Sequence, residues 1–531
     1  MSRIVMFVFN DCTTDARVLR EAESLAAIGH QVTIMARPRD LNATTIERER
    51  RNGFEIVRVP LPQGWKRWYV LARYPWRARG WIRFRFAYDA KRGPAGWAEA
   101  LAITPVAAAW IGWMLVRAPF YLGFKLLRRG RPQPGGDVLD WLVRWRFSIV
   151  GWARAAASAA PRADVYHGHD LSGLPGAVAA AEREARADQA PVAHGGDAAP
   201  RAAPPAGRVG RTDSAGSGGG AGTVRLPAGG QAPSVVYDSH EIYVESGRIA
   251  RLPRWVRGLL ARQEQRWVDR AAALVTVNQS LADDLSRRYH PARTVVVHNC
   301  PSRWIPPDPR PDLLRQAAGI PPEAPVALYH GGFSLHRGME ELAAALLEPG
   351  MEDVYAAYLG YGSERPRLDA MAADPRYGGR LRVLDAVPPD GLLPWVASAD
   401  VGVMPIQRST LNHYLSTPNK LFESLAAGVP VVVSDFPDMR RIALDDPDGP
   451  LGAVCDPSDP ASVARAIRSI LDLDAGALAG LRRRCLRAAH ERYNWETEVA
   501  RLFALYAELP GGALQSAGAT VVHAASPADG G

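Results

Sequence analysis

The sequence predicts an α/β protein with two doubly wound domains, each built around a parallel β-sheet. Short apolar runs that read as buried strands alternate with amphipathic helical stretches along the chain. This alternation stops in the middle and begins again near residue 325, and 531 residues are too many for one ordinary core. Strict alternation of strand and helix favours parallel strands whose sheet is covered by helices on both faces.

The first domain is predicted from its opening forty residues and from four later strand-like runs. Residues 4–9 read as a strand and not as a signal peptide, and Asp15 is placed to cap a helix that ends at Gly29. Residues 31–36 read as the second strand. The later strand-like runs begin at residues 164, 234, 272 and 294.

The second domain is predicted from residue 325 onward. A strand at 326–333 precedes a helix that begins near Met339, and an apolar helix within 417–428 leads into a buried strand at 429–433. An amphipathic stretch at 494–509 is expected to lie across both domains. We expect domains at 1–310 and 311–492, the crossing helix at 493–509 and a disordered tail at 510–531.

The segment 186–233 interrupts the first domain between two of its strands. It is rich in Gly, Ala, Pro, Arg and Ser and contains no Ile, Phe, Tyr, Trp or Met. Such a segment buries too little apolar area to offset the entropy lost on ordering. We therefore predict that it is disordered.

The segment 65–154 has a composition unlike the rest of the chain. It holds ten of the fifteen Trp, together with seventeen Lys or Arg against four acidic residues. The ten are Trp65, Trp68, Trp76, Trp81, Trp97, Trp110, Trp113, Trp141, Trp145 and Trp152. Trp and Arg beside apolar runs are typical of an element that lies in a bilayer interface, which is our interpretation. Two alternatives are core packing against the first domain, and a membrane span or re-entrant hairpin through the uncharged run 100–116.

The whole chain carries a formal net charge of +9, which favours an anionic partner. No nucleic-acid-binding module is recognisable, so an anionic membrane surface or a phosphorylated substrate is the expected partner. The four cysteines show neither paired nor metal-type spacing, which is typical of a reducing compartment and argues against a zinc site.

Polar residues follow the predicted strands of the first domain. In parallel-sheet domains ligands bind beside the carboxyl ends of the strands, so these positions are candidates for chemistry. They are Asp11, Asp15, His167, His169, Asp170, Asp238, His240 and Glu241. A histidine there can exchange hydrogen bonds with a sugar hydroxyl or a phosphate, although each cluster can instead satisfy a loop or cap a helix. A metal held by His167, His169 and Asp238 is conceivable, but the spacing is not diagnostic.

Glycines and cations occupy the corresponding places in the second domain. Gly331 and Gly332 come at the end of a strand, and Arg337 comes just before a helix, an arrangement that suits a phosphate. A second glycine-bearing turn is predicted at 360–363. Lys420 adds a cation, and Glu423, one helical turn later, adds a carboxylate able to accept both ribose hydroxyls. Together these groups predict a site for a nucleoside diphosphate.

At this point the chain resembles family 4 of the glycosyltransferases, whose members have the two-domain GT-B fold with two Rossmann-like domains and a cleft between them. The matching segments, in order, are DARVLREAESLAAIGHQVTI, DVYHGHD, VVYDSHE, ALVTVNQSLADDL, VVVHNCP, YHGGFSLHRGMEEL, ADVGVMPI and PNKLFESLAAGVPVVVSD. They cover most of the chain outside 65–154, 186–233 and the tail. The resemblance depends on their order more than on any one of them.

The resemblance implies roles for several residues. Glu423 would bind the donor ribose, Arg337 and Lys420 would hold the diphosphate, and His169 and Asp170 would lie where donor sugar meets acceptor. Family members retain the configuration of the transferred sugar and generally need no metal or other cofactor. The candidate catalytic residues are His169, Asp170, His240 and Glu241; the donor-binding candidates are Gly331, Gly332, Arg337, Gly360, Gly362, Asn419, Lys420, Leu421 and Glu423; Asp11 and Asp15 are placed on the acceptor side.

The chain departs from the family pattern at three places. The family often has a second glutamate eight positions before Glu423, where this chain has Leu415. A basic residue that is common near Gly331 and Gly332 is missing, as is a glycine pair in the loop at 10–15.

The predicted function is a retaining glycosyltransferase that moves a sugar from a UDP- or GDP-linked donor to a lipid-linked or cell-surface polysaccharide acceptor. It is expected to work in the cytoplasm, peripherally on the inner face of the cell membrane, without nucleic acid. An inactive GT-B scaffold and a nucleotide-sugar epimerase are the alternatives.

Overall fold

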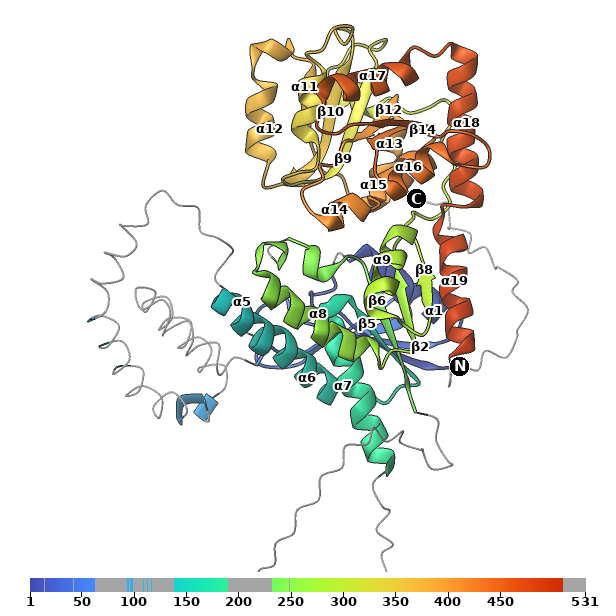
Figure 1. Cartoon of the computed structure of the whole chain (residues 1–531). Helices are drawn as coiled ribbons and strands as arrows, with labels where there is room; N and C mark the ends of the chain where they lie inside the picture. Colours follow the sequence, from blue (N-terminus) through green and yellow to red (C-terminus); the bar gives the residue numbers. More distant parts are fainter. Residues whose placement is uncertain are drawn as a thin grey trace, which may run out of the picture.

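The computed structural model describes residues 1–13, 15–41, 43–62, 138–189, 232–247 and 249–509, with isolated positions between 93 and 116. Most of the predicted insertion at 65–154, most of the predicted disordered segment at 186–233 and the predicted tail lie outside the described residues. The described chain forms two α/β lobes, each with its own sheet (Figure 1). This confirms the predicted fold class.

The first sheet has eight strands in the order β3-β4-β2-β1-β5-β6-β7-β8. All neighbours are parallel except β3 and β4. The strands are β1 (Arg3–Phe7), β2 (Gln31–Ala36), β3 (Glu47–Arg51), β4 (Phe54–Arg58), β5 (Val165–His169), β6 (Ser234–Ser239), β7 (Ala273–Thr276) and β8 (Thr294–Val296). The helices and turns are α1 (Ala16–Ala27), α5 (Val138–Val143), the π-helical η2 (Arg144–Ile149), α6 (Val150–Ala159), α7 (Asp170–Gln189), η3 (Tyr243–Glu245), η4 (Ile249–Arg251), α8 (Arg254–Val268) and α9 (Gln279–Tyr289).

The second sheet has six parallel strands in the order β11-β10-β9-β12-β13-β14. They are β9 (Val326–Phe333), β10 (Tyr355–Gly362), β11 (Leu381–Asp385), β12 (Val401–Met404), β13 (Val431–Ser434) and β14 (Gly452–Cys455). The helices are α10 (Leu313–Ala318), α11 (Met339–Ala345), α12 (Arg365–Ala372), α13 (Leu392–Ala397), α14 (Leu411–Leu415), α15 (Asn419–Ala426), α16 (Pro437–Leu444), α17 (Pro460–Leu471) and α18 (Ala475–Glu491), with short 3-10 turns η5 (Pro375–Tyr377) and η6 (Pro389–Gly391).

Both sheets are buried on two faces, as parallel strands require. On one face of the first sheet, apolar side chains of α6, α7 and α8 pack against Phe7 and Tyr166, whereas α1 packs on the other face against Ile4 and Met6. Strand β13 is buried along its whole length.

Helix α19 (Trp495–Glu508) returns from the second lobe and packs on the first sheet (Figure 1). Leu502, Leu505 and Tyr506 lie in the same apolar cluster as Ile4 and Met6 of β1. The helix begins at Asn494, whose side chain accepts a hydrogen bond from the backbone N–H of Thr497. The end of the chain that the structure describes therefore ties the second lobe to the first.

Three tryptophans that the sequence assigned to a membrane-facing segment belong to the first lobe. Trp152 is fully buried, Trp145 is 8% exposed, and both lie in the cluster under α6, α7 and α8. Trp141 stacks on Trp145, with ring centroids 5.5 Å apart. Residues 138–159 therefore follow the core-packing alternative, because these rings fill space between helices and the sheet. The structure describes no helix long and apolar enough to cross a membrane.

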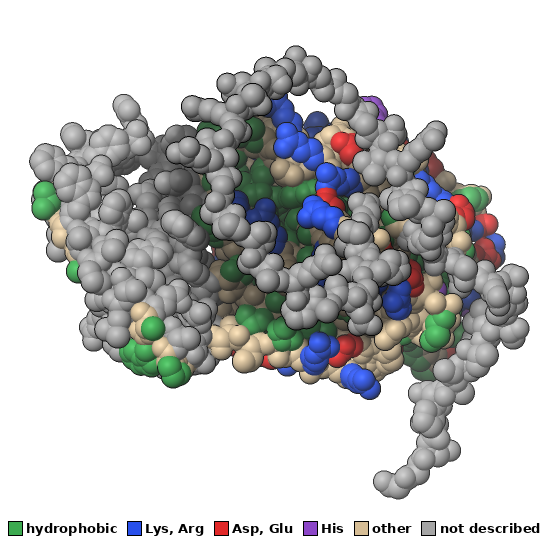
Figure 2. Space-filling model, turned by 90° about the horizontal axis from the view of Figure 1, so that it is seen from below, with side chains coloured by type: hydrophobic (Ala, Val, Ile, Leu, Met, Phe, Trp, Pro, Cys, Tyr) green, Lys and Arg blue, Asp and Glu red, His purple; other side chains and the backbone are tan. Residues whose placement is uncertain are grey.

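Seen from below, the described face of the first lobe carries Lys and Arg side chains among hydrophobic ones (Figure 2). Acidic side chains are also visible, so this face is mixed in sign.

Candidate functional site

The two lobes meet where strands of the first sheet end. Asn278, just after β7, donates through Nδ2 to the carbonyl of Leu415 (2.8 Å) and to Oγ1 of Thr417 (3.0 Å). Asn412 of α14 accepts from the backbone N–H of Ile242 (3.0 Å) and donates to Oε2 of Glu241 (3.1 Å). These side chains fix α14 and the start of α15 against the carboxyl ends of β6 and β7.

Helix α15 places Lys420 at this interface. Nζ of Lys420 lies 3.5 Å from the centroid of the Tyr329 ring, and burial together with the Arg337 guanidinium lowers the pKa of Lys420 well below its usual value. No carboxylate of the described residues forms an ion pair with Lys420 or Arg337. The charge of Glu423 opposes this lowering of the Lys420 pKa but does not cancel it. Two neighbouring cations that form no ion pair are the arrangement expected where an anionic ligand supplies the charge.

Glu423 lies one helical turn after Lys420, and its side chain contacts a histidine of the adjacent strand β9. Its Oε2 is 2.9 Å from Nε2 of His330, which is 1% exposed and belongs to β9. Burial alone would raise the pKa of Glu423, but the hydrogen bond and charge of His330, and then the charge of Lys420, lower it. The carboxylate is therefore ionised, oriented and 24% exposed, and it can accept hydrogen bonds from a ligand.

Gly331 and Gly332 form the end of β9 and are partly open to the interface. Gly331 has φ +101°, a conformation that L side chains rarely adopt, and a Cβ there would lie 3.8 Å from Nζ of Lys420. A Cβ at Gly332 would meet no atom within 4 Å. Both glycines therefore leave room beside the two cations.

Gly360 and Gly362 lie in a strand and not in the predicted turn, while their assignment to the donor side stays a prediction. Both belong to β10, where Gly360 pairs with Gly331 and Gly362 pairs with Phe333. A Cβ on Gly360 would lie 2.0 Å from the carbonyl oxygen of Gly331, and a Cβ on Gly362 would lie 2.1 Å from that of Phe333. These glycines are needed because β9 and β10 approach closely.

The two remaining donor-side candidates differ in position. Leu421 is fully buried in the core of the second lobe, so its side chain is not available to a ligand. Asn419 is exposed as the first residue of α15.

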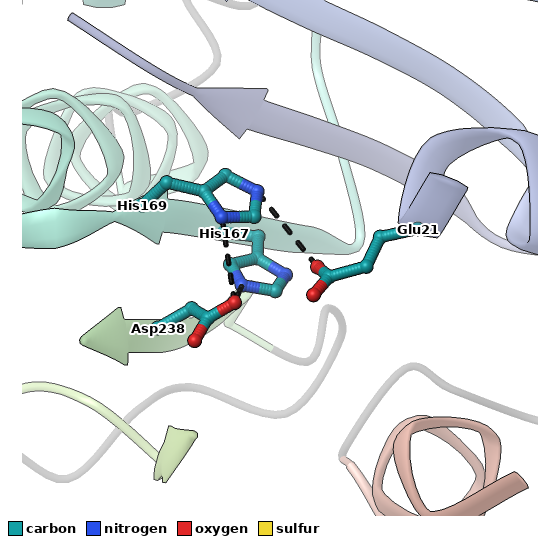
Figure 3. Close-up of side chains that lie close together, drawn as sticks. All are labelled: Glu21, His167, His169 and Asp238. Atoms are coloured by element: carbon teal, nitrogen blue, oxygen red, sulfur yellow. Dashed lines mark ion pairs between the residues drawn. The ribbon is translucent and has the colours of Figure 1, made fainter. Parts of the chain in front are cut away.

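His167 and His169, which the sequence placed after a strand, lie within β5 and belong to a buried charged cluster in the first lobe (Figure 3). Ligand atoms of Glu21, His167, His169 and Asp238 all lie within 4.8 Å of one another. The rings of His167 and His169 stack, with centroids 4.4 Å apart, because alternate residues of β5 point to the same face. His169 is therefore enclosed, with Nδ1 3.4 Å from Asp238 and Nε2 4.0 Å from Glu21.

Arg17 supplies the positive charge that this cluster needs. Its Nε lies 3.1 Å from Oδ2 of Asp238 and 3.0 Å from Oε1 of Glu21, and its Nη1 donates to the carbonyl of Val297 (2.7 Å). Although burial opposes ionisation, Arg17 is the main group that holds the pKa of Asp238 well below its usual value. A bound cation would have to compete with this guanidinium, so the donor set does not favour a metal.

Asp170 and His240 form the part of the cluster nearest the interface. The His240 side chain is 22% exposed, with Nε2 3.2 Å from Asp238 and Nδ1 3.6 Å from Asp170. Although burial opposes it, the two carboxylates raise the pKa of His240 to about 10. Asp170 accepts from the backbone N–H of His240 (3.1 Å) and has φ +53°, which a non-glycine residue rarely adopts. An imidazolium and a carboxylate thus face the same region.

Asp11 and Asp15 are engaged locally. Oδ1 of Asp15 accepts from the N–H of Val18 (3.3 Å) and caps α1, as predicted from the sequence. Oδ1 of Asp11 accepts from the N–H of Thr13 (3.1 Å); burial alone would raise the pKa of Asp11, but hydrogen bonds from Thr13 lower it.

Five residues of this region were not singled out from the sequence: Arg17, Glu21, His330, Asn412 and Asn278. Arg17 and Glu21 stand four positions apart on the buried face of α1, so a charged pair within an apolar stripe was the available signal. Oδ1 of Asn278 accepts a hydrogen bond from the N–H of Leu281 and caps α9. An asparagine just before an amphipathic stretch is a known signal for the start of a helix. Nothing in the sequence around His330 or Asn412 indicates their partners.

Comparisons with known proteins agree with this architecture. Residues 324–473 match the family described as Glycosyl transferases group 1. The chain is 31% identical over 258 residues to a D-inositol 3-phosphate glycosyltransferase of Xylanimonas cellulosilytica; the match covers 46% of this chain and 59% of the relative, and so spans little more than half of that relative's length.

Solved structures are similar over nearly the whole chain. A sucrose-phosphate synthase from Thermosynechococcus elongatus superposes with a TM-score of 0.55 at 15% identity, covering 95% of this chain and 98% of that one. An Anabaena protein solved with UDP and glucose gives a TM-score of 0.53 at 12% identity, covering 96% and 100%. The chain has the GT-B fold.

Proposed function

We propose that the protein is a nucleotide-sugar-dependent glycosyltransferase, because residues 324–473 match the group 1 glycosyl transferases and the chain has the GT-B fold. The observation that carries this proposal is the pair of neighbouring cations, Lys420 and Arg337, which form no ion pair with any described carboxylate and lie beside an open glycine strand end.

The donor diphosphate binds between these cations and the backbone of Gly331 and Gly332. Lys420, partly buried and without an ion pair among the described residues, gains a counter-charge, and the bare glycine backbone lets the phosphate oxygens approach. Glu423 accepts hydrogen bonds from the ribose hydroxyls, since His330 holds it ionised and fixed. Asn419 lies at the edge of this site, and Leu421 supports it from the core.

In the reaction, the bond between the sugar anomeric carbon and the diphosphate oxygen breaks, and a bond forms from that carbon to an acceptor hydroxyl oxygen. The hydroxyl proton is released, and the nucleoside diphosphate leaves with its negative charge. Lys420 and Arg337 stabilise this developing charge without a divalent ion. The sugar keeps its anomeric configuration.

The first lobe supplies the acceptor side. His240, held protonated between Asp170 and Asp238, donates hydrogen bonds to the donor sugar or acceptor, and Asp170 accepts from a hydroxyl. His169 and Glu241 act through other residues: His169 packs behind this pair, and Glu241 holds Asn412 of the second lobe.

We further propose a lipid-linked or surface-polysaccharide acceptor, reached at the cytoplasmic face of the membrane. The support is the excess of Arg, Lys and Trp in the sequence at 65–154, most of which lies outside the described residues.

The test is a transfer assay with UDP-, GDP- and ADP-linked sugars, in which membrane extract supplies the acceptor. We expect one donor to give radiolabelled product and free nucleoside diphosphate. Release of an isomerised nucleotide sugar without acceptor would identify an epimerase. Absence of saturable binding to every nucleotide would identify an inactive scaffold and overturn the proposal.

A further inference from the structure

Helix α8 carries an exposed stripe that the donor site does not use. Trp255 is 61% exposed and Leu259 is 50% exposed, although their neighbours Val256 and Leu260 are buried in the core of the first lobe. Large apolar side chains at this exposure, adjacent on one helix, are unfavourable in water unless a partner covers them.

Two arginines continue the same stripe. Trp255, Leu259, Arg262 and Arg266 are spaced by four, three and four residues, so at 3.6 residues per turn they lie within about 60° of one another. We call these four residues the α8 stripe. Neither arginine forms an ion pair with any residue in the described ranges, and both are exposed.

A shallow surface hollow of about 460 Å³ borders the cationic half of the stripe. It is lined by Ala261, Arg262, Gln265, Arg266, Arg288 and Tyr289. The wall holds three guanidinium groups and no carboxylate, although Asp284 pairs with Arg288 from outside it. Such a hollow is complementary to a phosphate group.

We propose that the α8 stripe docks the first lobe on an anionic lipid bilayer, with Trp255 and Leu259 in the interface and a lipid phosphate beside Arg262 and Arg266. A helix with an aromatic and an aliphatic side chain next to unpaired arginines is suited to the boundary between headgroups and acyl chains. Nucleic acid would engage the arginines but gives no burial to Leu259. The four residues of this surface all lie within the described residues and outside the segment 65–154.

The inference deepens the membrane part of the proposed function, and its test needs no sugar transfer, so failure here leaves the transferase proposal standing. The full chain is floated with vesicles of phosphatidylcholine containing phosphatidylglycerol, and with phosphatidylcholine alone. Two variants test the two halves of the stripe: Arg262→Gln with Arg266→Gln, and Trp255→Ser with Leu259→Ser. The matched control is Arg465→Gln with Arg483→Gln, which removes the same charge from exposed arginines of the second lobe.

We expect the parent chain and the control to float with anionic vesicles only, and less so at high salt. Loss of both stripe arginines should lower the partition coefficient by about thirtyfold, taking about fivefold, or about 1 kcal/mol, per cation near the surface. The Trp255 and Leu259 variant should float at least about tenfold less well, because apolar insertion is lost. All variants should keep the parent's unfolding temperature, since these side chains are exposed. Parent-like flotation of both stripe variants, no flotation of the parent, or binding to RNA in place of vesicles would overturn the inference.

Discussion

Nε2 of His330 lies 2.9 Å from Oε2 of Glu423, so the last residue of β9 before the glycine pair fixes the carboxylate assigned to the donor ribose. The contact joins a strand and a helix ninety-three positions apart. The contact gives the buried His330 ring a polar partner and holds the Glu423 carboxylate in one orientation.

Replacing Glu423 should therefore damage donor binding more than folding. Glu423→Gln keeps the size of the side chain but removes the charge that strengthens hydrogen bonds to ribose, a loss of about 1.5–3 kcal/mol. We expect KM for the donor to rise about tenfold to a hundredfold, with a smaller change in kcat. Glu491→Gln, at a surface pair with Arg492, is the control and should leave KM unchanged. Equal KM values for both variants would contradict the assignment.

An added methyl group should lower the stability of the chain at Gly360 but mainly the affinity for nucleotide at Gly332. Gly360→Ala puts a Cβ 2.0 Å from a backbone oxygen of β9 and should cost about 3 kcal/mol or more in the free energy of unfolding. Gly332→Ala meets nothing within 4 Å, so its stability should change by less than about 1 kcal/mol while nucleotide affinity falls. Denaturant unfolding measures the change in stability, and nucleotide titration measures the change in affinity. A Gly360→Ala chain as stable as the parent would contradict the close approach of β9 and β10 at this position.

Removal of divalent ions should leave the reaction intact. In the proposed site Lys420 and Arg337 stabilise the charge that develops on the diphosphate, so exhaustive dialysis against EDTA is expected to leave turnover unchanged. The measurement is the initial rate before and after dialysis. Loss of activity that Mg²⁺ or Mn²⁺ restores would refute the cation-only site.

Stability should depend on pH through a buried carboxyl group in the first lobe. Burial raises the pKa of Glu264 to about 7, even though the hydroxyls of Tyr237 and Tyr289 each donate to it at 2.7 Å. Between the unfolded pKa of about 4.5 and the folded one, the folded chain holds a proton that the unfolded chain has lost, so stability falls as pH rises across this window. At about 1.4 kcal/mol per pH unit the fall reaches about 3 kcal/mol.

Glu264→Gln removes the titrating carboxyl group and should make the free energy of unfolding depend less on pH between 4.5 and 7. Unfolding by denaturant at several pH values between 4.5 and 7.5 measures it, with Glu491→Gln as the surface control. A slope identical to the parent's would show that Glu264 is ionised in the folded chain.

The sequence predicted the two-sheet architecture because buried parallel strands read as short continuous apolar runs, as at residues 431–433 of β13, and these runs alternate with amphipathic helical stretches. It did not predict β3, whose residues are all charged and which pairs antiparallel with β4 at the sheet edge. The available signal was Asn52-Gly53, with φ values of 41° and 85°, the dipeptide that favours a tight hairpin turn.

Candidate site residues could be proposed from the sequence where the residue type alone suggests its chemistry, but not where the role depends on a partner that is distant in the chain. Lys420 and Glu423 could be proposed together because they lie one turn apart on a single predicted helix. The surroundings of His169 depend on Glu21, which is 148 positions earlier in the chain. Gly360 resembles a ligand-facing glycine until the register of β9 and β10 is known.

The central claim is that a nucleoside diphosphate binds at Lys420 and Arg337. Crystals of the full chain grown with UDP or GDP test it most directly. We expect phosphate oxygens within hydrogen-bond distance of both side chains, with the ribose hydroxyls on Glu423. A diphosphate bound elsewhere, with these three side chains still free, would contradict the account.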